Sequence, residues 1–229
     1  MQANSSDKST RLNKYLAHMT GISRREADEA IAAGRVMIND TPAALGAQIN
    51  DNDTVRFDKQ VVKPTTYTYL AINKPAGYVC SRKQQGDGQT IFSLLPEEFR
   101  KLKTVGRLDR ESSGLILLTD DGDFAQSMTH PRYVKQKVYE VTLSDTLTPL
   151  HQQMITDRGI DLADGRSMFM IQKQDATNSY LVTMHEGRNR QIRRTFAALG
   201  YGVTRLHRIQ FGNYHLEGIA QGNFQRVEK

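Results

Sequence analysis

Residues 105–124 read VGRLDRESSGLILLTDDGDF. The apolar run LILL at 115–118 lies between Gly114 and the turn signal DDG at 120–122, a pattern that predicts a buried strand ending in a turn. Asp109 would then lie on a loop that leads into the core. Loops held by a buried strand often present reactive side chains, but an aspartate alone in such a loop is more often a turn former.

Composition limits the classes of protein that the chain can be. Its 229 residues suit one large domain, or one medium domain with a small one. A formal charge of +6 at pH 7 and a pI near 9.4 favour a polyanionic partner, with nucleic acid as the first candidate. No apolar run approaches the roughly eighteen residues of a membrane span, and MQANSSDKST lacks a signal-peptide core. We therefore expect a cytoplasmic protein that does not enter a membrane.

Cysteine and histidine spacing gives no sign of a metal site. Cys80 is the only cysteine, so an internal disulfide is impossible, and we expect a buried free thiol. No set of cysteines and histidines has the spacing of zinc ligands, and the acids of TDDGDF lack calcium-loop spacing. The chain also lacks a phosphate loop, a nicotinamide fingerprint and a serine-nucleophile elbow. We expect chemistry by side chains alone, without metal or cofactor.

A small α+β module is predicted for residues 10–57, after a disordered tail over 1–9. Leu12, Leu16 and Met19 have helical spacing that ends at Gly21. A second helix follows, with Ser23 as its N-cap and a capping box to the residue three positions on, and it ends before Gly34. Residues 36–38 and 55–57 read as strands.

The polar stretch DKQVVKPTT, residues 58–66, is predicted to be a linker to a larger domain over 67–229. Strands are predicted over 67–72, 115–118, 138–143, 168–171 and 180–184, and helices over 124–128, 147–157 and 190–199. Many strands with few intervening helices indicate an α+β domain with a mainly antiparallel mixed sheet flanked by helices. They argue against a doubly wound parallel sheet.

Three segments of the larger domain carry polar residues that a core does not require. They are NKPAG at 73–77, the Asp109 loop, and EGRNRQIRR at 186–194, which opens the last predicted helix with four arginines. A basic helix opening can be a solvated surface. Because Arg205, His207 and Arg208 follow soon after, the C-terminal third offers a concentrated phosphate-binding surface.

The N-terminal pattern RLNKYLAHMTGISRREADEAIAAGRVMIND resembles an S4 RNA-binding domain over almost its whole length. Its local charge is nearly balanced by acids, so charge alone would be a weak argument for RNA binding. S4 domains bind structured RNA through a face of two helices. The resemblance implies RNA contacts at Arg11, Lys14, Ser23, Arg24, Arg25 and Arg35.

GRLDRESSGLILLTDDGDF closely resembles the catalytic motif of pseudouridine synthases, and NKPAGYVC, KVYEVTL, EGRNRQIRR and LHRIQFG resemble their other motifs in the same order. Together with the S4 pattern, the chain is similar to the RsuA/RluB/RluE/RluF family of ribosomal RNA pseudouridine synthases from about Thr10 to Val227. The resemblance implies that Asp109 is the catalytic carboxylate.

The same resemblance implies that Tyr139 stacks on the target uracil and that Arg193 pairs with Asp109. A neighbouring arginine would keep a carboxylate ionised, and an aromatic platform suits a base that has left its stack. Tyr139 would otherwise be an ordinary sheet residue, and a single aspartate departs from the paired acids of glycosidases. We predict further RNA contacts at Lys74, Arg107, Arg188, Asn189, Arg190, Arg194, Arg205 and Arg208.

The predicted function is isomerisation of one uridine in a folded ribosomal RNA stem-loop by a monomer, with the S4 domain adding affinity. The spelling EGRNRQIRR favours 23S RNA, and 16S RNA is the alternative. Two rivals are a non-catalytic RNA-binding or ribosome-assembly protein and a glycosidase that releases free base. The presence of Asp109, Tyr139 and Arg193 together argues against the non-catalytic rival.

Overall fold

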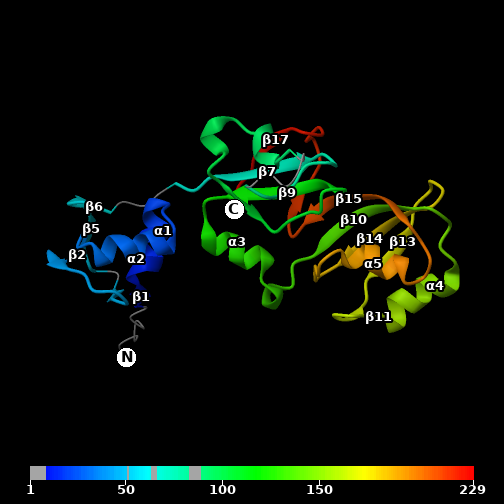
Figure 1. Ribbon diagram of the computed structural model, residues 1–229, viewed down its shortest axis with the longest axis horizontal. Helices are drawn as coiled ribbons and strands as arrows, with labels where there is room; N and C mark the ends of the chain where they lie inside the picture. The colour runs from blue at the N-terminus through cyan, green and yellow to red at the C-terminus, as the bar shows by residue number, and fades with distance from the viewer. Residues whose placement is uncertain (1–8, 51, 63–65, 83–88) are drawn as a thin grey trace, which may run out of the picture. The chain divides into compact units, whose positions relative to one another are not determined.

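A computed structural model describes residues 9–50, 52–62, 66–82 and 89–229. The chain divides into two compact units, Met1–Tyr67 and Thr68–Lys229 (Figure 1). The tail predicted for 1–9 lies outside the described residues except for its last residue. None of the helices in the described ranges combines the length and apolar character needed to cross a bilayer.

Two helices of the first unit follow the predicted pattern. α1 (Leu12–Thr20) ends at Gly21, whose φ of 77° is a left-handed conformation that favours glycine. α2 (Arg24–Ala32) begins with the predicted capping box: Ser23 Oγ accepts from the Glu26 amide at 3.2 Å, and the Ser23 amide donates to Glu26 Oε2 at 2.6 Å. Apolar residues of both helices form the core of this unit with Val36, Ile49 and Val55.

The first unit also contains two small sheets. β2 (Val36–Ile38) and β5 (Val55–Phe57) were predicted and form a four-stranded sheet in the order β3-β2-β5-β6, with β3 at Thr41–Pro42 and β6 at Gln60–Val61. β1 (Thr10–Arg11) pairs with β4 (Gln48–Ile49), and α1 follows β1 directly at Leu12.

The linker predicted for 58–66 begins too early, because β6 pairs with β5 inside it. Asp58 and Lys59 turn this hairpin at φ of 48° and 66°, which are the positive values of a two-residue hairpin turn. Arg35 holds the turn with a hydrogen bond from Nε to Asp58 Oδ1 at 2.8 Å. An Asp-Lys pair without glycine is a weak turn signal, so the hairpin was missed.

One nine-stranded mixed sheet forms the frame of the second unit, which confirms the predicted fold class. Its main path runs β13-β14-β10-β15-β9-β7-β17, while β8 pairs with β9 and β16 with β15. Every pairing is antiparallel except β9 with β15. The strands are β7 Tyr69–Lys74, β8 Lys103–Val105, β9 Ser113–Thr119, β10 Lys137–Leu143, β13 Met170–Lys173, β14 Ser179–Met184, β15 Val203–Phe211, β16 Tyr214–His215 and β17 Phe224–Arg226.

The helices of this unit lie close to their predicted positions. α3 covers Gly122–Thr129, α4 covers Pro149–Gln153 and continues as a π-helical turn over Met154–Arg158, and α5 covers Gln191–Ala197. Shorter elements are the 3-10 turns Ile91–Leu94, Glu97–Phe99 and Pro131–Tyr133 and the hairpin of β11 (Ile160–Leu162) with β12 (Gly165–Ser167).

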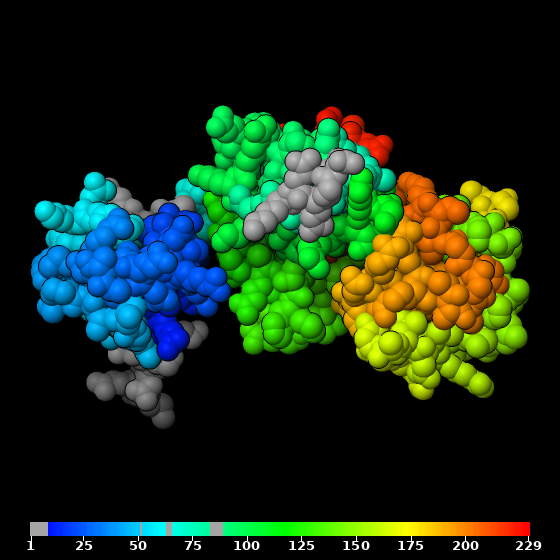
Figure 2. Space-filling model, viewed as in Figure 1, coloured from blue at the N-terminus to red at the C-terminus, as the bar shows by residue number. Residues whose placement is uncertain are grey.

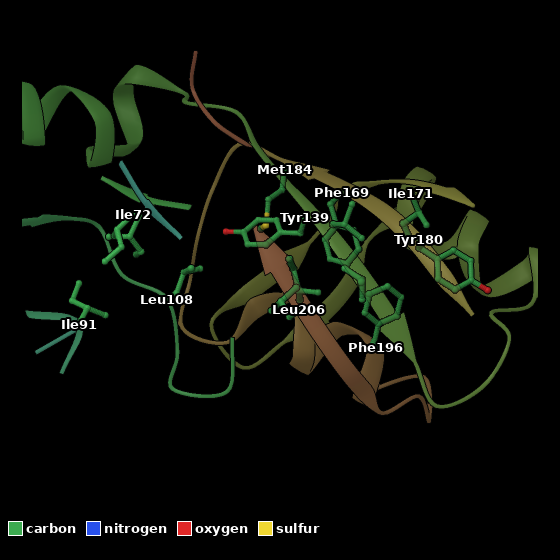
Figure 3. Packing of buried hydrophobic residues seen from close by; sticks show 14 of the residues in the cluster. Ile72, Ile91, Leu108, Tyr139, Phe169, Ile171, Tyr180, Met184, Phe196 and Leu206 are labelled. Atoms are coloured by element: carbon green, nitrogen blue, oxygen red, sulfur yellow. The ribbon is translucent and has the colours of Figure 1, made fainter. Parts of the chain in front are cut away.

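The LILL run of β9 is buried on both faces. Ile116 and Leu118 pack into one apolar cluster, and Leu115 and Leu117 into another that includes Phe124 of α3. A strand covered on both sides reads as a continuous apolar run without alternation, which is why this segment was predicted correctly. Figure 3 shows the first cluster, which continues along the sheet to Tyr139 and Phe196.

β15 was not predicted although it is the longest strand, and β7 and β13 each begin two residues later than expected. The sequence of β15, VTRLHRIQF, interrupts its apolar positions with two arginines and a histidine. Their charges suggested a phosphate-binding surface instead of a central strand.

The parallel contact between β9 and β15 depends on Gly114. Gly114 pairs with Arg208, and a Cβ added at Gly114 would lie 2.2 Å from the Arg208 carbonyl oxygen. Its φ of +106° is also a conformation that L side chains rarely adopt. Only glycine allows the two halves of the sheet to approach this closely.

We expect Gly114→Ala to lower the free energy of unfolding by at least about 3 kcal/mol, since it adds a backbone clash to an unfavourable φ. Urea denaturation of the full chain measures the change. Gly122→Ala is the matched control, because a Cβ there meets nothing within 4 Å and φ is ordinary; its effect should stay within about 1 kcal/mol. Equal stability of the two variants would contradict the proposed role of the β9–β15 contact.

Candidate active site

A cleft of about 790 Å³ in the second unit is lined by both Asp109 and Tyr139. Its walls come from the loop before β9, the end of α3 with the loop that follows, the first residues of β10, and the segment between β14 and α5. In the space-filling view, the green surface of α3 lies beside the orange surface of α5 (Figure 2). The structure therefore brings together two side chains that lie thirty positions apart in the sequence.

Asp109 is half-buried at the cleft wall, and its carboxylate makes no hydrogen bond or ion pair with any of the described residues. Its main chain is well held: the Ser112 amide donates to the Asp109 carbonyl at 3.1 Å, and the amide of the preceding Leu108 donates to Cys80 Sγ at 3.5 Å. The expected free thiol of Cys80 is half-buried, and burial raises its pKa. The loop thus fixes the position of a carboxylate that is free to meet a ligand.

Lys74 holds the Asp109 loop from beneath. Its side chain is fully buried, and Nζ donates to the carbonyls of Pro75 at 2.9 Å, Arg110 at 3.4 Å and Ser112 at 2.5 Å. Burial lowers its pKa to about 8, while the charges of Cys80, Asp109 and Glu111 act in the opposite direction. The RNA contact predicted for Lys74 is therefore wrong, because no part of its ammonium is open to a ligand.

Arg208 is also buried, so its predicted RNA contact at the surface is wrong as well. Its side chain is 2% exposed, and Nε donates to the Leu115 carbonyl of β9 at 2.8 Å. Its guanidinium lies 4.8 Å from the centre of the Phe211 ring. Arg208 thus reinforces with its side chain the β9–β15 junction that it forms with its backbone.

Tyr139 points into the cleft from β10. It pairs with Val182 of β14 and with Arg208 of β15, and a bulge in the β10–β15 pairing lies directly before it. In Figure 3 its ring lies between Met184 and Leu206, with the hydroxyl directed toward the side of Leu108. Tyr139 is only 7% exposed and packs among apolar residues, but it lines the cleft. A ligand in the cleft can therefore contact it.

The direct ion pair predicted between Arg193 and Asp109 is absent from the described structure. Arg193 donates from Nη1 to the Val203 carbonyl at 2.8 Å, and from Nη2 to the Glu111 carbonyl at 3.4 Å and Ser112 Oγ at 3.3 Å. Burial and then the charge of Arg190 lower the pKa of Arg193, whereas Glu111 and Asp109 raise it. Arg193 therefore ties α5 to the Asp109 loop and places a positive charge near the carboxylate without bonding to it.

Other arginines of EGRNRQIRR are occupied by protein partners. Arg188 donates to the carbonyls of Asp164, Gly165 and Arg166 at 2.8 Å each, which fixes the β11–β12 hairpin. Arg194 forms an ion pair with Asp164 at 2.7 Å and is partly buried. These contacts explain how the segment is held and leave Asn189 and Arg190 as the exposed members of the predicted set.

Exposed cations surround the mouth of the cleft. Arg107 and Arg190 both line it, and Arg190 pairs with Glu111 at 2.6 Å with its side chain 43% exposed. Arg205 is exposed and pairs with Glu140 at 2.9 Å, but it does not line this cleft. Exposed pairs of this kind contribute little stability, so a phosphate can replace the carboxylate at small cost.

The residues predicted to contact RNA in the first unit lie on α1, α2 and the flanking chain. Arg11, Arg24 and Arg25 are exposed, Lys14 is half-buried, and Ser23 forms the capping box of α2. Arg35 is exposed but forms an ion pair with Asp58 at 2.5 Å.

Lys137 lines the cleft and was not predicted as a site residue. It precedes Tyr139 by two positions in β10, so both side chains project from the same face of the sheet. That spacing in the motif KVYEVTL was the signal that could have identified it. No group of three or more potential metal ligands occurs among the described residues.

Comparison with known proteins gives one consistent result. The profile of the family described as RNA pseudouridylate synthase matches residues 68–198, and that of the S4 domain matches residues 10–55. Ribosomal large subunit pseudouridine synthase B of Bacillus subtilis (strain 168) is 31% identical over 224 residues, which is 95% of this chain and 91% of that protein. Ribosomal small subunit pseudouridine synthase A of Yersinia pestis is 36% identical, over 94% of this chain and 93% of that protein. A crystal structure of a pseudouridylate synthase has a TM-score of 0.67 at 30% identity and covers 96% of each chain.

The buried position of Lys74 predicts a pH dependence of stability. Its pKa of about 8 in the folded protein lies below the ordinary 10.5, so between these values the unfolded chain binds a proton that the folded chain has released. The free energy of unfolding should therefore gain a rising contribution from about pH 8 toward pH 10.5, and Lys74→Met should remove it.

Urea denaturation across this pH range measures the effect, with Lys103→Met, an exposed lysine of β8, as the control. Hydrogen exchange provides a second readout. Amides of residues 109–113 should exchange at least about tenfold faster in Lys74→Met, which corresponds to about 1.4 kcal/mol of lost local protection. Unchanged exchange would show that the loop does not depend on Lys74.

Proposed function

This chain belongs to the RNA pseudouridylate synthase family and carries an S4 domain, and on that premise we propose that it converts a specific uridine of ribosomal RNA into pseudouridine. Membership of the family makes it an isomerase that acts on RNA. The names of its relatives support ribosomal RNA as the substrate.

The observation that carries the proposed mechanism is the pairing of Asp109 and Tyr139 in one cleft. The Asp109 carboxylate is not engaged by any described residue, and the Tyr139 ring borders the same space. A uridine taken out of its stack would find an aromatic surface for its base and a carboxylate for its reacting atoms. We assign Asp109 as the catalytic carboxylate and Tyr139 as the platform for the uracil.

Isomerisation breaks the bond from N1 to C1′, turns the uracil, and joins C5 to C1′, while the C5 proton is replaced by one on N1. Asp109 can attack C1′, attack the base, or remove a sugar proton, and each route requires an ionised carboxylate close to the ribose. The cleft keeps the detached uracil enclosed while it turns, which prevents loss of the base to solvent.

We assign Arg193 a positioning role. Its guanidinium donates hydrogen bonds to Glu111 and Ser112, which follow Asp109 by two and three positions. Arg193 thereby holds the loop that presents the Asp109 carboxylate. The charge of Asp109 also raises the pKa of Arg193, against the larger lowering by burial, so the two groups lie near each other.

We place the RNA backbone along the exposed cations Arg107 and Arg190 at the mouth of the cleft, with Asn189 beside them. The S4 domain, through Arg11, Lys14, Ser23, Arg24, Arg25 and Arg35, adds affinity for a structured stem-loop. We propose that the enzyme acts as a monomer in the cytoplasm, where ribosomal RNA or an assembly intermediate is available.

We propose 23S RNA as the substrate, because EGRNRQIRR has the spelling of large-subunit enzymes. Relatives named for the large and for the small subunit match at similar identity, 31% and 36%, so the motif is the observation that favours one of them.

Asp109→Asn should lower the single-turnover rate of pseudouridine formation by at least about a thousandfold. RNA affinity should change less than about threefold, because the amide keeps the shape of the side chain and loses only its charge. Pseudouridine and free uracil are quantified in the same reaction, so that an isomerase is distinguished from a glycosidase. Asp145→Asn, at an exposed position after β10, is the control and should react at the wild-type rate. A parallel loss of binding and turnover would refute the catalytic role of Asp109.

The substrate is identified by mapping pseudouridine in 23S and 16S RNA from cells with and without the gene. We expect one 23S position to be lost in the deletion strain and restored by the wild-type gene but not by Asp109→Asn. Loss of a 16S position instead would contradict the assignment to the large subunit.

A further inference from the structure

Two cations that line the cleft have no hydrogen-bonded carboxylate partner among the described residues. Lys137, at the start of β10, donates from Nζ only at 3.4 and 3.3 Å, to the carbonyls of His185 and Glu186. Arg208 is 2% exposed, and its Nη2 has no hydrogen-bond partner within the described ranges. Nη2 has almost no accessible surface, so Arg208 adds positive charge beside the cleft without presenting a donor to a ligand.

These two cations lie close to each other. Lys137 Nζ is 5.5 Å from the centre of the Phe211 ring, and the Arg208 guanidinium is 4.8 Å from the same centre. Burial and then the charge of Arg208 lower the pKa of Lys137 to about 8, and only Glu186 acts against them. The carboxylate of Glu186 is itself shared with Arg188 and Gln191, so the floor keeps excess positive charge.

Tyr139, the proposed platform for the uracil, is a neighbour of both cations in the sheet. Lys137 and Tyr139 project from the same face of β10, and Arg208 is the β15 residue opposite Tyr139. All three line the cleft. A base that stacks on the Tyr139 ring therefore lies in the same cleft as the Lys137 ammonium.

We propose that Lys137 binds a carbonyl oxygen of the target uracil and, with the buried charge of Arg208 nearby, stabilises the negative charge that develops on the base when the N1–C1′ bond breaks. The electron pair of that bond passes to the uracil, and returns to C1′ from C5 when the new bond forms and the C5 proton moves to N1. A preformed cation in a site shielded from water stabilises such charge far more than solvent does. This assignment rests on the proposed isomerisation of a uridine bound in the cleft.

Depth in the cleft favours the base over an RNA phosphate as the ligand. A phosphodiester stays connected to the chain on both sides, so it is best bound where cations are open to solvent, as Arg107 and Arg190 are at the mouth. Lys137 is half-buried and lines the cleft, so it suits a group that enters the cleft. A base taken out of its stack is such a group.

The test compares Lys137→Gln and Lys137→Arg with wild type in single-turnover reactions on the mapped RNA stem-loop, over a range of enzyme concentrations. Lys137→Gln should lower the rate at saturating enzyme about a hundredfold and change the half-saturating concentration less than threefold. Lys137→Arg keeps the charge and should stay within about tenfold of wild type. Lys173→Gln, an exposed lysine on β13 outside the cleft, is the matched control and should behave as wild type.

A pH profile gives an independent readout. The groups that face Lys137 are Arg208 of β15 and, from the segment after β14, Glu186. Because Lys137 loses its proton near pH 8, the ratio of the saturating rate to the half-saturating concentration should fall about tenfold per pH unit above that value in wild type. Lys137→Arg should remove this fall, while ionisation of the uridine itself affects both proteins equally.

Two results would overturn the inference. A loss in Lys137→Gln that lies in the half-saturating concentration and shrinks at low salt would identify a phosphate contact. An unchanged pH profile in Lys137→Arg would show that Lys137 does not act through its charge, even if Lys137→Gln folds poorly. Wild-type protein without any isomerisation would instead contradict the proposed function, so the two failures are distinguishable.

Discussion

The close approach of Gly114 to Arg208 is the constraint on which the catalytic unit depends. At this point a parallel pairing, the only one among the described strands of the sheet, joins the half that carries the Asp109 loop to the half that carries Tyr139. No side chain larger than hydrogen fits between the two backbones. The sheet thereby fixes β9, which follows the Asp109 loop, relative to β10, which carries Tyr139.

Basic residues of this unit divide into two groups with different functions. The first group holds the chain in place by donating hydrogen bonds to backbone carbonyls of the Asp109 loop and the β11–β12 hairpin; its members are Lys74, Arg188 and Arg193. Burying these cations costs solvation, and the carbonyls that they satisfy return part of it. A carboxylate on a loop stays in place only if the loop is rigid, and these cations hold the chain on either side of the cleft. The second group faces the cleft.

Local signals allowed much of the fold to be predicted from sequence. The capping box of Ser23 and the doubly buried LILL run depend on neighbours within a few positions, and the structure contains both. β15 was missed because its arginine and histidine positions are explained only by its place between β10 and β9. The role of Arg193 was misjudged for a related reason: residue type indicates a cation, whereas the bond that it makes is decided by the backbone packed against it.

The difference between exposed cations at the mouth and less exposed cations inside explains how one cleft can bind two kinds of negative charge differently. Phosphates carry their charge permanently and are held at the mouth, where exposed cations exchange partners at little cost. The uracil acquires charge only while its bond to the sugar is broken, and a half-buried cation stabilises that transient charge more than an exposed one because less water competes for it. The charge of Lys137 and Arg208 around the cleft that Tyr139 lines therefore favours the reacting state of the base over its resting state, which is the condition for acceleration of the reaction.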